Sequence, residues 1–411
     1  MKTSFVLIAL LWGLLLSPYS SQRCTGVRGE GPAAPAAGFA ALTGHFHRLV
    51  DSGALAGTVM LVARGDRAFT DAYGMQDIEL ERPMQMNTIF RIASMTKPIV
   101  SVAVMMLVEE GKLSLDDPLE KYLPAFSGLQ VYDPEKGRIP LRRSITVRDL
   151  MMHTSGFSAG DFDQTPVGAL YREAFETAPT SLESLVNTLG TLPLAHQPGE
   201  GWTYGHSTDV LARVAEIASG TPIRQLLRQR LFEPLGMVDT DFGVPADKAD
   251  RFAALYGAGL ALRQSAAESP YVKGEIFPRG NGGLVSTAHD YGRFANMLAA
   301  GGIFDGRRYL KAESLGLMMR NHLPESMIPL RVGPISTPGQ GFGLGFGVLV
   351  ENTEYGGRKG DCFWPGAAFT YFFVQPESGT VGIFLCQNTD LSKLHYLYEF
   401  HGLAGEAFDQ N

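Results

Sequence analysis

The sequence is poor in the residues that build disulfide frameworks, metal sites and nucleic-acid surfaces. Only three of 411 residues are cysteine, Cys24, Cys362 and Cys386. One pair can form and leave one thiol free, a choice that the sequence leaves open. The net charge is -7 and no long basic run occurs, which argues against nucleic acid as a partner. No H-E-x-x-H motif is present, so we expect neither a metal nor another cofactor.

Long apolar runs are also scarce, and the one that stands out is at the N-terminus. Within residues 1–21, Lys2 precedes an apolar stretch that is too short to span a bilayer comfortably, which predicts a signal peptide. An N-terminal membrane anchor is the alternative. Residues 22–38 are rich in proline and small side chains and are typical of a linker. We therefore expect an exported protein, periplasmic or secreted, with no stable membrane insertion after signal removal.

Strand patterns lie at both ends of the remaining chain. Gly57–Gly74 predicts a β-hairpin, because two apolar or β-branched runs flank a Gly-Asp turn. FTYFFVQPESGTVGIFLCQN, residues 369–388, predicts two more strands joined by a turn. Between these ends, Ile99 to Val108 is apolar on nearly all sides and predicts a helix buried in the middle of the protein.

This order of elements predicts a single α/β (α+β) domain over residues 39–411. We expect an antiparallel sheet flanked by helices, formed by residues 39–109 and 281–411. Residues 110–280, which are broken by many prolines and glycines, are expected to form a mostly helical insert that shapes the substrate pockets.

One serine matches a familiar esterase motif. Gly156-Phe157-Ser158-Ala159-Gly160 is a G-x-S-x-G, and a nucleophile elbow of that kind needs a buried strand before the serine and a helix after it. Before Ser158, however, Thr146 and Asp149 have the spacing of a helix capping box. After it the chain is polar and Pro166 interrupts it. We interpret Ser158 as a turn serine in a surface loop.

A second serine has a better context for catalysis. Ser94-Met95-Thr96-Lys97 is an S-x-x-K that opens the most apolar helix pattern of the sequence. Side chains three residues apart share a helix face, so the Ser94 hydroxyl and the Lys97 amine can meet. Burial would lower the pKa of Lys97, or Lys97 would hold a neighbouring phenol ionised, and either effect activates a serine. The alternative is a helix-capping serine with a lysine that extends to the surface.

The segments IFRIASMTKPIVS, QPGEGWTYGHSTDVL and WPGAAFTYFFVQPESG, with others in the same order, resemble the penicillin-recognising serine hydrolases. The resemblance extends over roughly Phe39 to Phe408. It is closest to the class C beta-lactamase-like branch and its family VIII carboxylesterases, and it implies a beta-lactamase/DD-peptidase-like fold. It implies Ser94 as the nucleophile, Lys97 as its partner and Tyr204 as the tyrosine of a Y-x-N motif. The backbone N–H groups of Ser94 and Ala367 would form the oxyanion hole.

Two departures from the family pattern bear on the substrate. Trp364-Pro365-Gly366 stands where lactamases carry K-T-G on an edge strand, so the cation that would pair with a substrate carboxylate is missing. Trp364 and Gly366 are expected to contact an uncharged acyl or aryl ester, with simple packing as the alternative for Trp364. His206 replaces the Asn of Y-x-N, and we expect it to bind the acyl group or Lys97, or only to fill space.

The expected function is therefore a serine carboxylesterase that hydrolyses short-chain or aromatic esters, with a small-molecule ester as its partner. Ser94 attacks after Tyr204 accepts its proton, and Lys97 tunes Tyr204. The alternatives are a beta-lactamase or D-amino-acid peptidase, and an acyltransferase to an alcohol or amine. A further alternative is a catalytically inactive relative that binds wall fragments or a partner, and the intact Ser94, Lys97 and Tyr204 set argues against it.

Overall fold

The computed structural model describes residues 37–161, 163–333 and 335–410. The predicted signal peptide and almost all of the predicted linker lie outside the described residues, as does Cys24. In the part that is described, Cys362 and Cys386 are both free and buried, so these two thiols are not joined. No helix among the described residues is long and apolar enough to cross a bilayer.

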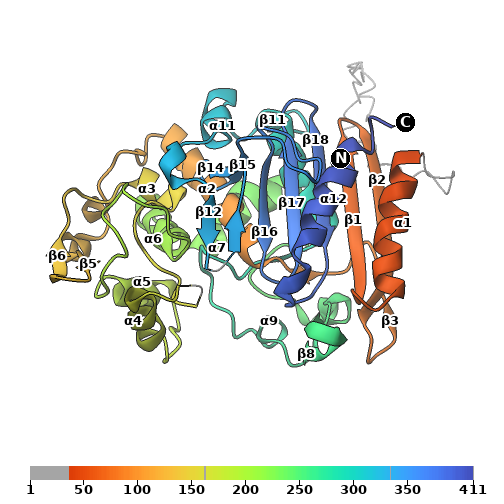
Figure 1. Cartoon of the computed structure of the whole chain (residues 1–411), viewed down its shortest axis with the longest axis horizontal. Helices are drawn as coiled ribbons and strands as arrows, with labels where there is room; N and C mark the ends of the chain where they lie inside the picture. Colours follow the sequence, from red (N-terminus) through yellow and green to blue (C-terminus); the bar gives the residue numbers. More distant parts are fainter. Residues whose placement is uncertain (1–36, 162, 334, 411) are drawn as a thin grey trace, which may run out of the picture. The chain divides into compact units, whose positions relative to one another are not determined.

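An eight-stranded antiparallel sheet, counted within the described residues, takes its strands from both ends of the chain (Figure 1). Its order is β14-β15-β16-β17-β18-β1-β2-β3. The predicted hairpins are confirmed as β1 with β2 and β17 with β18. The strands are β1 (Gly57–Arg64), β2 (Arg67–Asp77), β3 (Arg82–Pro83), β14 (Gln340–Phe342), β15 (Gly347–Leu349), β16 (Cys362–Gly366), β17 (Thr370–Gln375) and β18 (Thr380–Leu385).

Helices cover both faces of this sheet, which explains why β1 is apolar on both sides. Val59 and Leu61 pack into a core with α2 and α10, whereas Met60 and Val62 pack on the opposite face with α1 and α12. Successive side chains of a strand point to opposite faces, so each core takes every second residue. The covering helices are α1 (Ala37–Asp51), α2 (Thr96–Glu109), α10 (Ala288–Ala299) and α12 (His395–Glu406).

The expectation of a helix in the middle of the protein is confirmed by α2. All twelve residues from Thr96 to Leu107 are buried. Such burial on every side requires neighbours all round, and α2 contacts α6 and α7 in addition to the main core.

Between α2 and α10 the chain is mostly short helices and turns, with small hairpins. The capping box predicted at Thr146 and Asp149 is confirmed at the start of α3. The helices are α3 (Val147–Met152), α4 (Pro166–Ala174), α5 (Leu182–Leu189), α6 (Ser207–Ser219), α7 (Ile223–Leu227), α8 (Glu233–Leu235) and α9 (Pro270–Lys273). The strand pairs are β5 (Gln130–Asp133) with β6 (Gly137–Pro140), and β7 (Leu255–Tyr256) with β8 (Leu262–Gln264).

The remaining elements are short and connect these parts. They are β4 (Phe90–Arg91) paired with β9 (Val285–Ser286), β10 (Ile303–Phe304) with β11 (Arg307–Arg308), α11 (Ala312–Met318), and β12 (Leu330–Val332) with β13 (Ile335–Thr337). The pairing of β4 with β9 holds the chain just before Ser94 against a segment almost 200 residues further on, because Phe90 pairs with Ser286 and Arg91 with Val285. The β12–β13 hairpin is one wall of the cavity described below.

Candidate active site

Ser94 lies in a tight turn immediately before α2. Ala93–Met95 form one turn of 3-10 helix, and α2 begins at Thr96. Ala93 has a φ of 43°, a left-handed conformation that costs energy for a residue with a side chain. The hydroxyl of Thr96 donates to the Ala93 carbonyl at 2.7 Å and helps to hold this turn. The strained residue therefore directly precedes the serine.

The structure brings Ser94, Lys97 and Tyr204 together. Lys97 Nζ lies 3.1 Å from Ser94 Oγ, as expected for side chains three residues apart at a helix start. The Tyr204 hydroxyl donates to the same Oγ at 2.7 Å. Tyr204 comes from the loop before α6, and the Lys97 Nζ lies 4.6 Å from its ring centroid. One serine oxygen is thus in contact with an amine and a phenol.

Burial shifts the pKa values of these two partners in opposite directions. Lys97 is 1% exposed, and desolvation of its ammonium form holds its pKa well below the usual value. Desolvation raises the pKa of Tyr204 to about 12, although the hydrogen bond with Ser94 acts the other way. Both shifts favour the uncharged forms, a neutral amine beside a neutral phenol. Of the two alternatives that the sequence leaves open, these shifts agree with the lowered pKa of Lys97 rather than with an ionised phenol.

An ion pair behind Lys97, between a buried aspartate and a partly exposed arginine, was missed at the level of sequence. Lys97 Nζ donates to the backbone carbonyl of Asn281 at 2.6 Å, and the Asn281 N–H donates to Asp209 Oδ1 at 2.7 Å. Asp209 is fully buried in the first turn of α6, and Arg279 Nη2 lies 2.9 Å from its Oδ2. Burial alone would raise the pKa of Asp209, but the charge of Arg279 and the contact with His206 hold it well below its usual range. Asp209 therefore fixes the carbonyl that Lys97 contacts.

The structure places His206 beside Asp209. Its Nδ1 lies 2.8 Å from Asp209 Oδ2, and its ring centroid lies 5.1 Å from that of Phe175. His206 is not among the described residues that line the cavity beside Ser94. The i,i+3 spacing of His206 and Asp209 on α6 explains this placement, because a buried carboxylate is the stronger partner for an imidazole. His206 supports Asp209 from behind the site.

Ser94 opens into an apolar cavity of about 130 Å³, which we call the Ser94 cavity. Its lining brings together the predicted site residues Tyr204, Trp364, Gly366 and Ala367. Of the described residues that line it, none is Lys or Arg. The others are Trp202, Leu330, Val332, Ile335, Thr337, Gln340, Pro365, Leu391, Leu394, Leu397 and Tyr398.

The strand that carries Trp364 reaches Ser94 because of a glycine. A Cβ on Gly366 would collide with the carbonyl oxygen of Ile92 and with the hydroxyl of Thr370. Glycine therefore allows β16 to pack directly on the Ser94 turn, and Ala367 follows at the cavity. Among the described residues, Trp364–Gly366 pair with β17 alone, whereas the start of β16 also pairs with β15. This half of the strand is thus an edge, where Pro365 is tolerated.

Ser158 is held away from such chemistry. It follows α3 rather than a strand, and its hydroxyl donates to Asp163 Oδ2 at 2.7 Å and accepts the Gly160 N–H at 3.1 Å. The expectation of a surface position is wrong, because Ser158 is fully buried. Gly205 packs against the backbone of this loop so closely that a Cβ would overlap it. The G-x-S-x-G loop therefore supports the segment that carries Tyr204.

Within residues 37–161, 163–333 and 335–410, no group of three or more His, Cys, Asp and Glu side chains is placed to hold a metal ion. The sequence matches the family described as Beta-lactamase over residues 42–404. The chain belongs to the beta-lactamase family. Its serine, lysine and tyrosine thus lie inside the matched region.

Relatives of this beta-lactamase family protein include esterases. It is 37% identical to Protein Rv1367c of Mycobacterium tuberculosis (strain ATCC 25618 / H37Rv), over 83% of this chain and 88% of the relative. It is 30% identical to Esterase EstB of Burkholderia gladioli, over 82% of this chain and 86% of the relative. Its fold matches that of EstCE1, "a hydrolase with promiscuous acyltransferase activity", with a TM-score of 0.74 and 25% identity, over 89% and 97% of the two chains. This beta-lactamase family protein is a serine hydrolase of the carboxylesterase type.

Proposed function

We propose that this carboxylesterase hydrolyses short-chain or aromatic esters whose acyl group is uncharged, through an acyl-enzyme on Ser94. The observation that carries the proposal is the lining of the Ser94 cavity, which places Trp364 beside the serine and includes no basic side chain among the described residues. A substrate carboxylate would lose its hydration there without gaining a cation, whereas an alkyl or aryl group gains contact with apolar walls.

Acylation begins with the neutral amine of Lys97. As Ser94 Oγ attacks the ester carbonyl carbon, its proton passes to Lys97, whose Nζ lies 3.1 Å away. The oxyanion then accepts hydrogen bonds from the backbone N–H groups of Ser94 and Ala367, which both line the cavity. The new ammonium lies next to the Tyr204 ring and lowers the energy of its phenolate. Tyr204 can therefore give its proton to the leaving alkoxide when the C–O bond breaks.

Deacylation reverses these transfers. A water molecule gives one proton to the Tyr204 phenolate and adds its oxygen to the acyl carbon. When the tetrahedral intermediate collapses, the bond to Ser94 Oγ breaks and Lys97 returns the first proton to that oxygen. The carboxylic acid leaves, and serine, amine and phenol are restored. In this scheme Lys97 accepts the serine proton, and Tyr204 acts first as an acid and then as a base.

The substrate proposal is tested with two activated esters of similar length, p-nitrophenyl butyrate and the mono-p-nitrophenyl ester of succinic acid. We expect kcat/KM to favour the neutral butyrate by about tenfold or more, because the second ester must place a carboxylate near Trp364. Trp364→Lys supplies a cation for the carboxylate, so it should reduce the ratio of kcat/KM for the butyrate to kcat/KM for the succinate ester. Equal use of both esters by the wild type, or faster turnover of the lactam nitrocefin than of either ester, would contradict the proposal.

Acyl transfer is a second candidate function, favoured by the likeness to EstCE1. An alcohol can take the place of the attacking water, because Tyr204 can accept its proton in the same way. The test adds an alcohol to p-nitrophenyl butyrate turnover and measures the ratio of butyrate ester to free butyrate. Transfer predicts that this ratio exceeds the molar ratio of alcohol to water, and a ratio at or below that value would exclude a dedicated acceptor site.

Export of the protein is also proposed here, on the signal-like residues 1–21. N-terminal sequencing of the mature protein from the native host should begin after this segment. A mature protein that still begins at Met1, in the cytoplasmic fraction, would contradict the proposal.

A further inference from the structure

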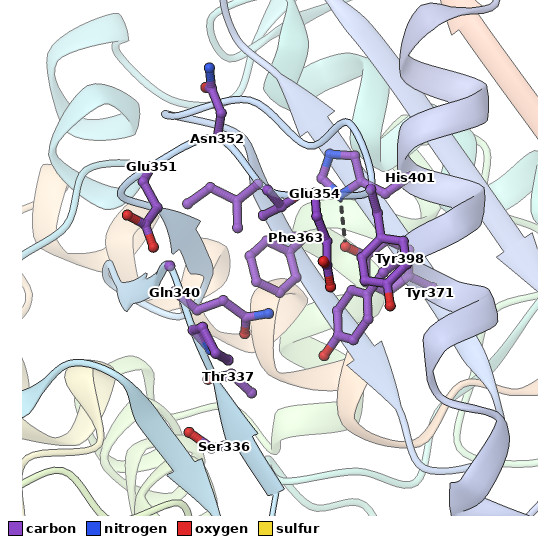
Figure 2. A pocket seen from close by; sticks show the side chains of 15 residues that line it. Ser336, Thr337, Gln340, Glu351, Asn352, Glu354, Phe363, Tyr371, Tyr398 and His401 are labelled. Atoms are coloured by element: carbon purple, nitrogen blue, oxygen red, sulfur yellow. Dashed lines mark hydrogen bonds between the residues drawn. The ribbon is translucent and has the colours of Figure 1, made fainter.

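A second cavity lies next to the Ser94 cavity and is larger. Its volume is about 360 Å³, and it shares Thr337, Gln340 and Tyr398 with the wall of the Ser94 cavity. Figure 2 shows Tyr398 approaching it from α12, Thr337 from the end of β13 and Gln340 from the start of β14. Because three side chains belong to both walls, a substrate bound at Ser94 can extend toward this second cavity.

The second cavity is acidic. Glu351 and Glu354 belong to the connection between β15 and β16, and Figure 2 shows their side chains on either side of Phe363 in this view. Both glutamates are exposed, and Glu354 hydrogen-bonds with Tyr355 of the same wall. Among the described residues that line the cavity, no basic side chain forms an ion pair with either carboxylate. The described lining contains no Lys or Arg, and His401 is its single imidazole.

His401 does not neutralise the carboxylates, because both of its nitrogens are already engaged. Its Nε2 lies 2.8 Å from Asp361 Oδ2, and its Nδ1 lies 2.8 Å from the Tyr371 hydroxyl (Figure 2). All three side chains are buried. With Nε2–H donating to the carboxylate, Nδ1 accepts the proton of the Tyr371 hydroxyl. The imidazole thus remains tied to these two partners.

Aromatic rings form much of the remaining wall. The rings of Tyr355 and Tyr398 are stacked, with centroids 6.2 Å apart and planes 23° from parallel. Phe363 and Tyr371 add two more faces. Glu354 lies close to these rings, because its charge and its hydrogen bond raise the pKa of the exposed Tyr355 hydroxyl. Ring faces and carboxylates both attract cations, and an ammonium group can gain from both at once.

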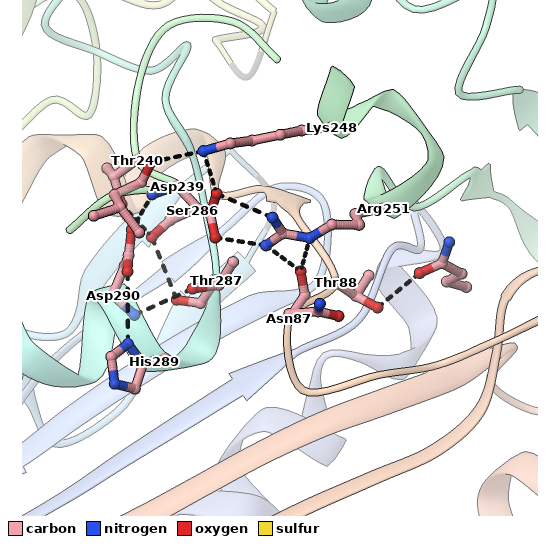
Figure 3. A network of polar contacts seen from close by, with 12 residues as sticks. Asn87, Thr88, Asp239, Thr240, Lys248, Arg251, Ser286, Thr287, His289 and Asp290 are labelled. Atoms are coloured by element: carbon pink, nitrogen blue, oxygen red, sulfur yellow. Dashed lines mark hydrogen bonds and ion pairs between the residues drawn. The ribbon is translucent and has the colours of Figure 1, made fainter. Parts of the chain in front are cut away.

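A different cavity of the protein is also lined by carboxylates, but there basic side chains of the protein form ion pairs with them. That cavity has a volume of about 450 Å³ and is lined by Asp239, Asp241 and Glu233. Figure 3 shows Lys248 and Arg251 converging on Asp239, with distances of 2.7 and 2.5 Å. The other two carboxylates are paired as well, Asp241 with Arg224 and Glu233 with Arg228. The charges of that wall are balanced, whereas those of Glu351 and Glu354 are not.

We propose that the second cavity binds an ammonium group on the remote part of an ester whose scissile bond lies at Ser94. The inference rests on the proposed function and narrows its substrate class to esters with an uncharged acyl group and a cationic end away from the reacting bond. Glu351 and Glu354 supply the charge, and Tyr355, Tyr398 and Phe363 supply the ring faces.

Binding is measured without turnover, by calorimetry on Ser94→Ala with choline and with its uncharged isostere 3,3-dimethylbutanol. We expect choline to bind about tenfold more tightly than the isostere. Adding Glu351→Gln and Glu354→Gln should remove this preference, with thermal unfolding confirming that the protein is folded. The control Glu135→Gln removes an exposed charge on the β5–β6 turn, and this variant should retain the preference for choline. Equal affinity for both compounds, or an unchanged preference in the double substitution, would overturn the proposal.

Turnover separates this proposal from the proposed function. With the wild-type protein, kcat/KM for butyrylcholine should exceed that for 3,3-dimethylbutyl butyrate by about tenfold, and each single substitution, Glu351→Gln or Glu354→Gln, should reduce the ratio. If p-nitrophenyl butyrate is hydrolysed through Ser94 but the two matched esters are used equally, the ammonium site is wrong and the esterase stands. If none of the esters is hydrolysed through Ser94, the proposed function itself is wrong.

Discussion

Two serines of this protein carry motifs of serine hydrolases, and their surroundings differ in one decisive way. Ser158 has its hydroxyl proton directed at Asp163 and its oxygen occupied by the Gly160 N–H. Ser94 instead meets an amine, Lys97, and a phenol, Tyr204, at the edge of a cavity. A serine with a carboxylate and a backbone donor is a structural link, whereas a serine beside a neutral amine has a base to accept its proton.

A serine motif therefore identifies a nucleophile only when the secondary structure around the serine is also that of a catalytic site. The G-x-S-x-G occurs here without the strand that a nucleophile elbow requires, because α3 precedes it. The S-x-x-K occurs at the start of a helix that is buried from Thr96 to Leu107, so that its lysine has few alternatives to contact with the serine. Four predictions test this difference, and they are ordered by the size of the expected effect.

The largest effect is expected from removing the two hydroxyls separately. Ser94→Ala should reduce kcat/KM for p-nitrophenyl butyrate by at least about a thousandfold, because the acyl-enzyme cannot form. Ser158→Ala should retain activity within about threefold of the wild type, because its oxygen does not face the cavity. Initial rates with both purified variants check this, and comparable losses in the two variants would remove the distinction.

The next effect concerns the base. Lys97→Met should lower kcat/KM by about a hundredfold or more, and Lys97→Arg should not restore it, because a guanidinium does not release its proton.

In the wild type, the depressed pKa of Lys97 predicts that activity persists well below the pH at which an ordinary lysine becomes charged. Activity should fall on the acid side as Lys97 gains a proton. A pH–rate profile that rises only near the usual lysine pKa would contradict this role.

The third effect concerns the support behind Lys97. Asp209→Asn leaves Arg279 without its buried partner and should lower the free energy of unfolding by about 3 kcal/mol. Because the folded-state pKa of Asp209 is depressed, its stabilisation is present above its unfolded-state pKa and is lost as the pH falls toward the folded-state value. The difference between wild type and variant in urea unfolding should therefore shrink in acid. A constant difference would show that charge is not the cause.

The smallest effect is expected in the stability of the Ser158 loop. Ser158→Ala leaves the half-buried carboxylate of Asp163 without one hydrogen bond and should lower the free energy of unfolding by about 1 kcal/mol. Urea unfolding measures this value, and Ser94→Ala provides the matched comparison of a serine whose hydroxyl donates to no carboxylate. A stability equal to that of the wild type would mean that Ser158 has no structural role.

Features that depend on neighbouring residues were predictable from the sequence. The β1–β2 hairpin followed from alternating apolar residues around a glycine turn, and the contact of Ser94 with Lys97 followed from helix periodicity. The resemblance to a known family added Tyr204 and the strand with Trp364, which local patterns cannot connect with Ser94.

Features that depend on long-range packing were not predictable. Asp209 and Arg279 are separated by 70 positions, and no local pattern pairs them. The role of His206 could not be decided because its partner is this same carboxylate. The polar sequence of its loop predicts that Ser158 is exposed. Its burial could not be predicted because it depends on the close approach of Gly205 from another segment. The second cavity also combines residues from five separate parts of the chain.

The central claim, that Ser94 rather than Ser158 is the nucleophile, is tested most directly by covalent labelling. The wild-type protein is treated with a fluorophosphonate, digested, and the modified peptide is sequenced by mass spectrometry. We expect a single adduct on Ser94, which is absent in Ser94→Ala and retained in Ser158→Ala. An adduct on Ser158, retained in Ser94→Ala, would contradict it.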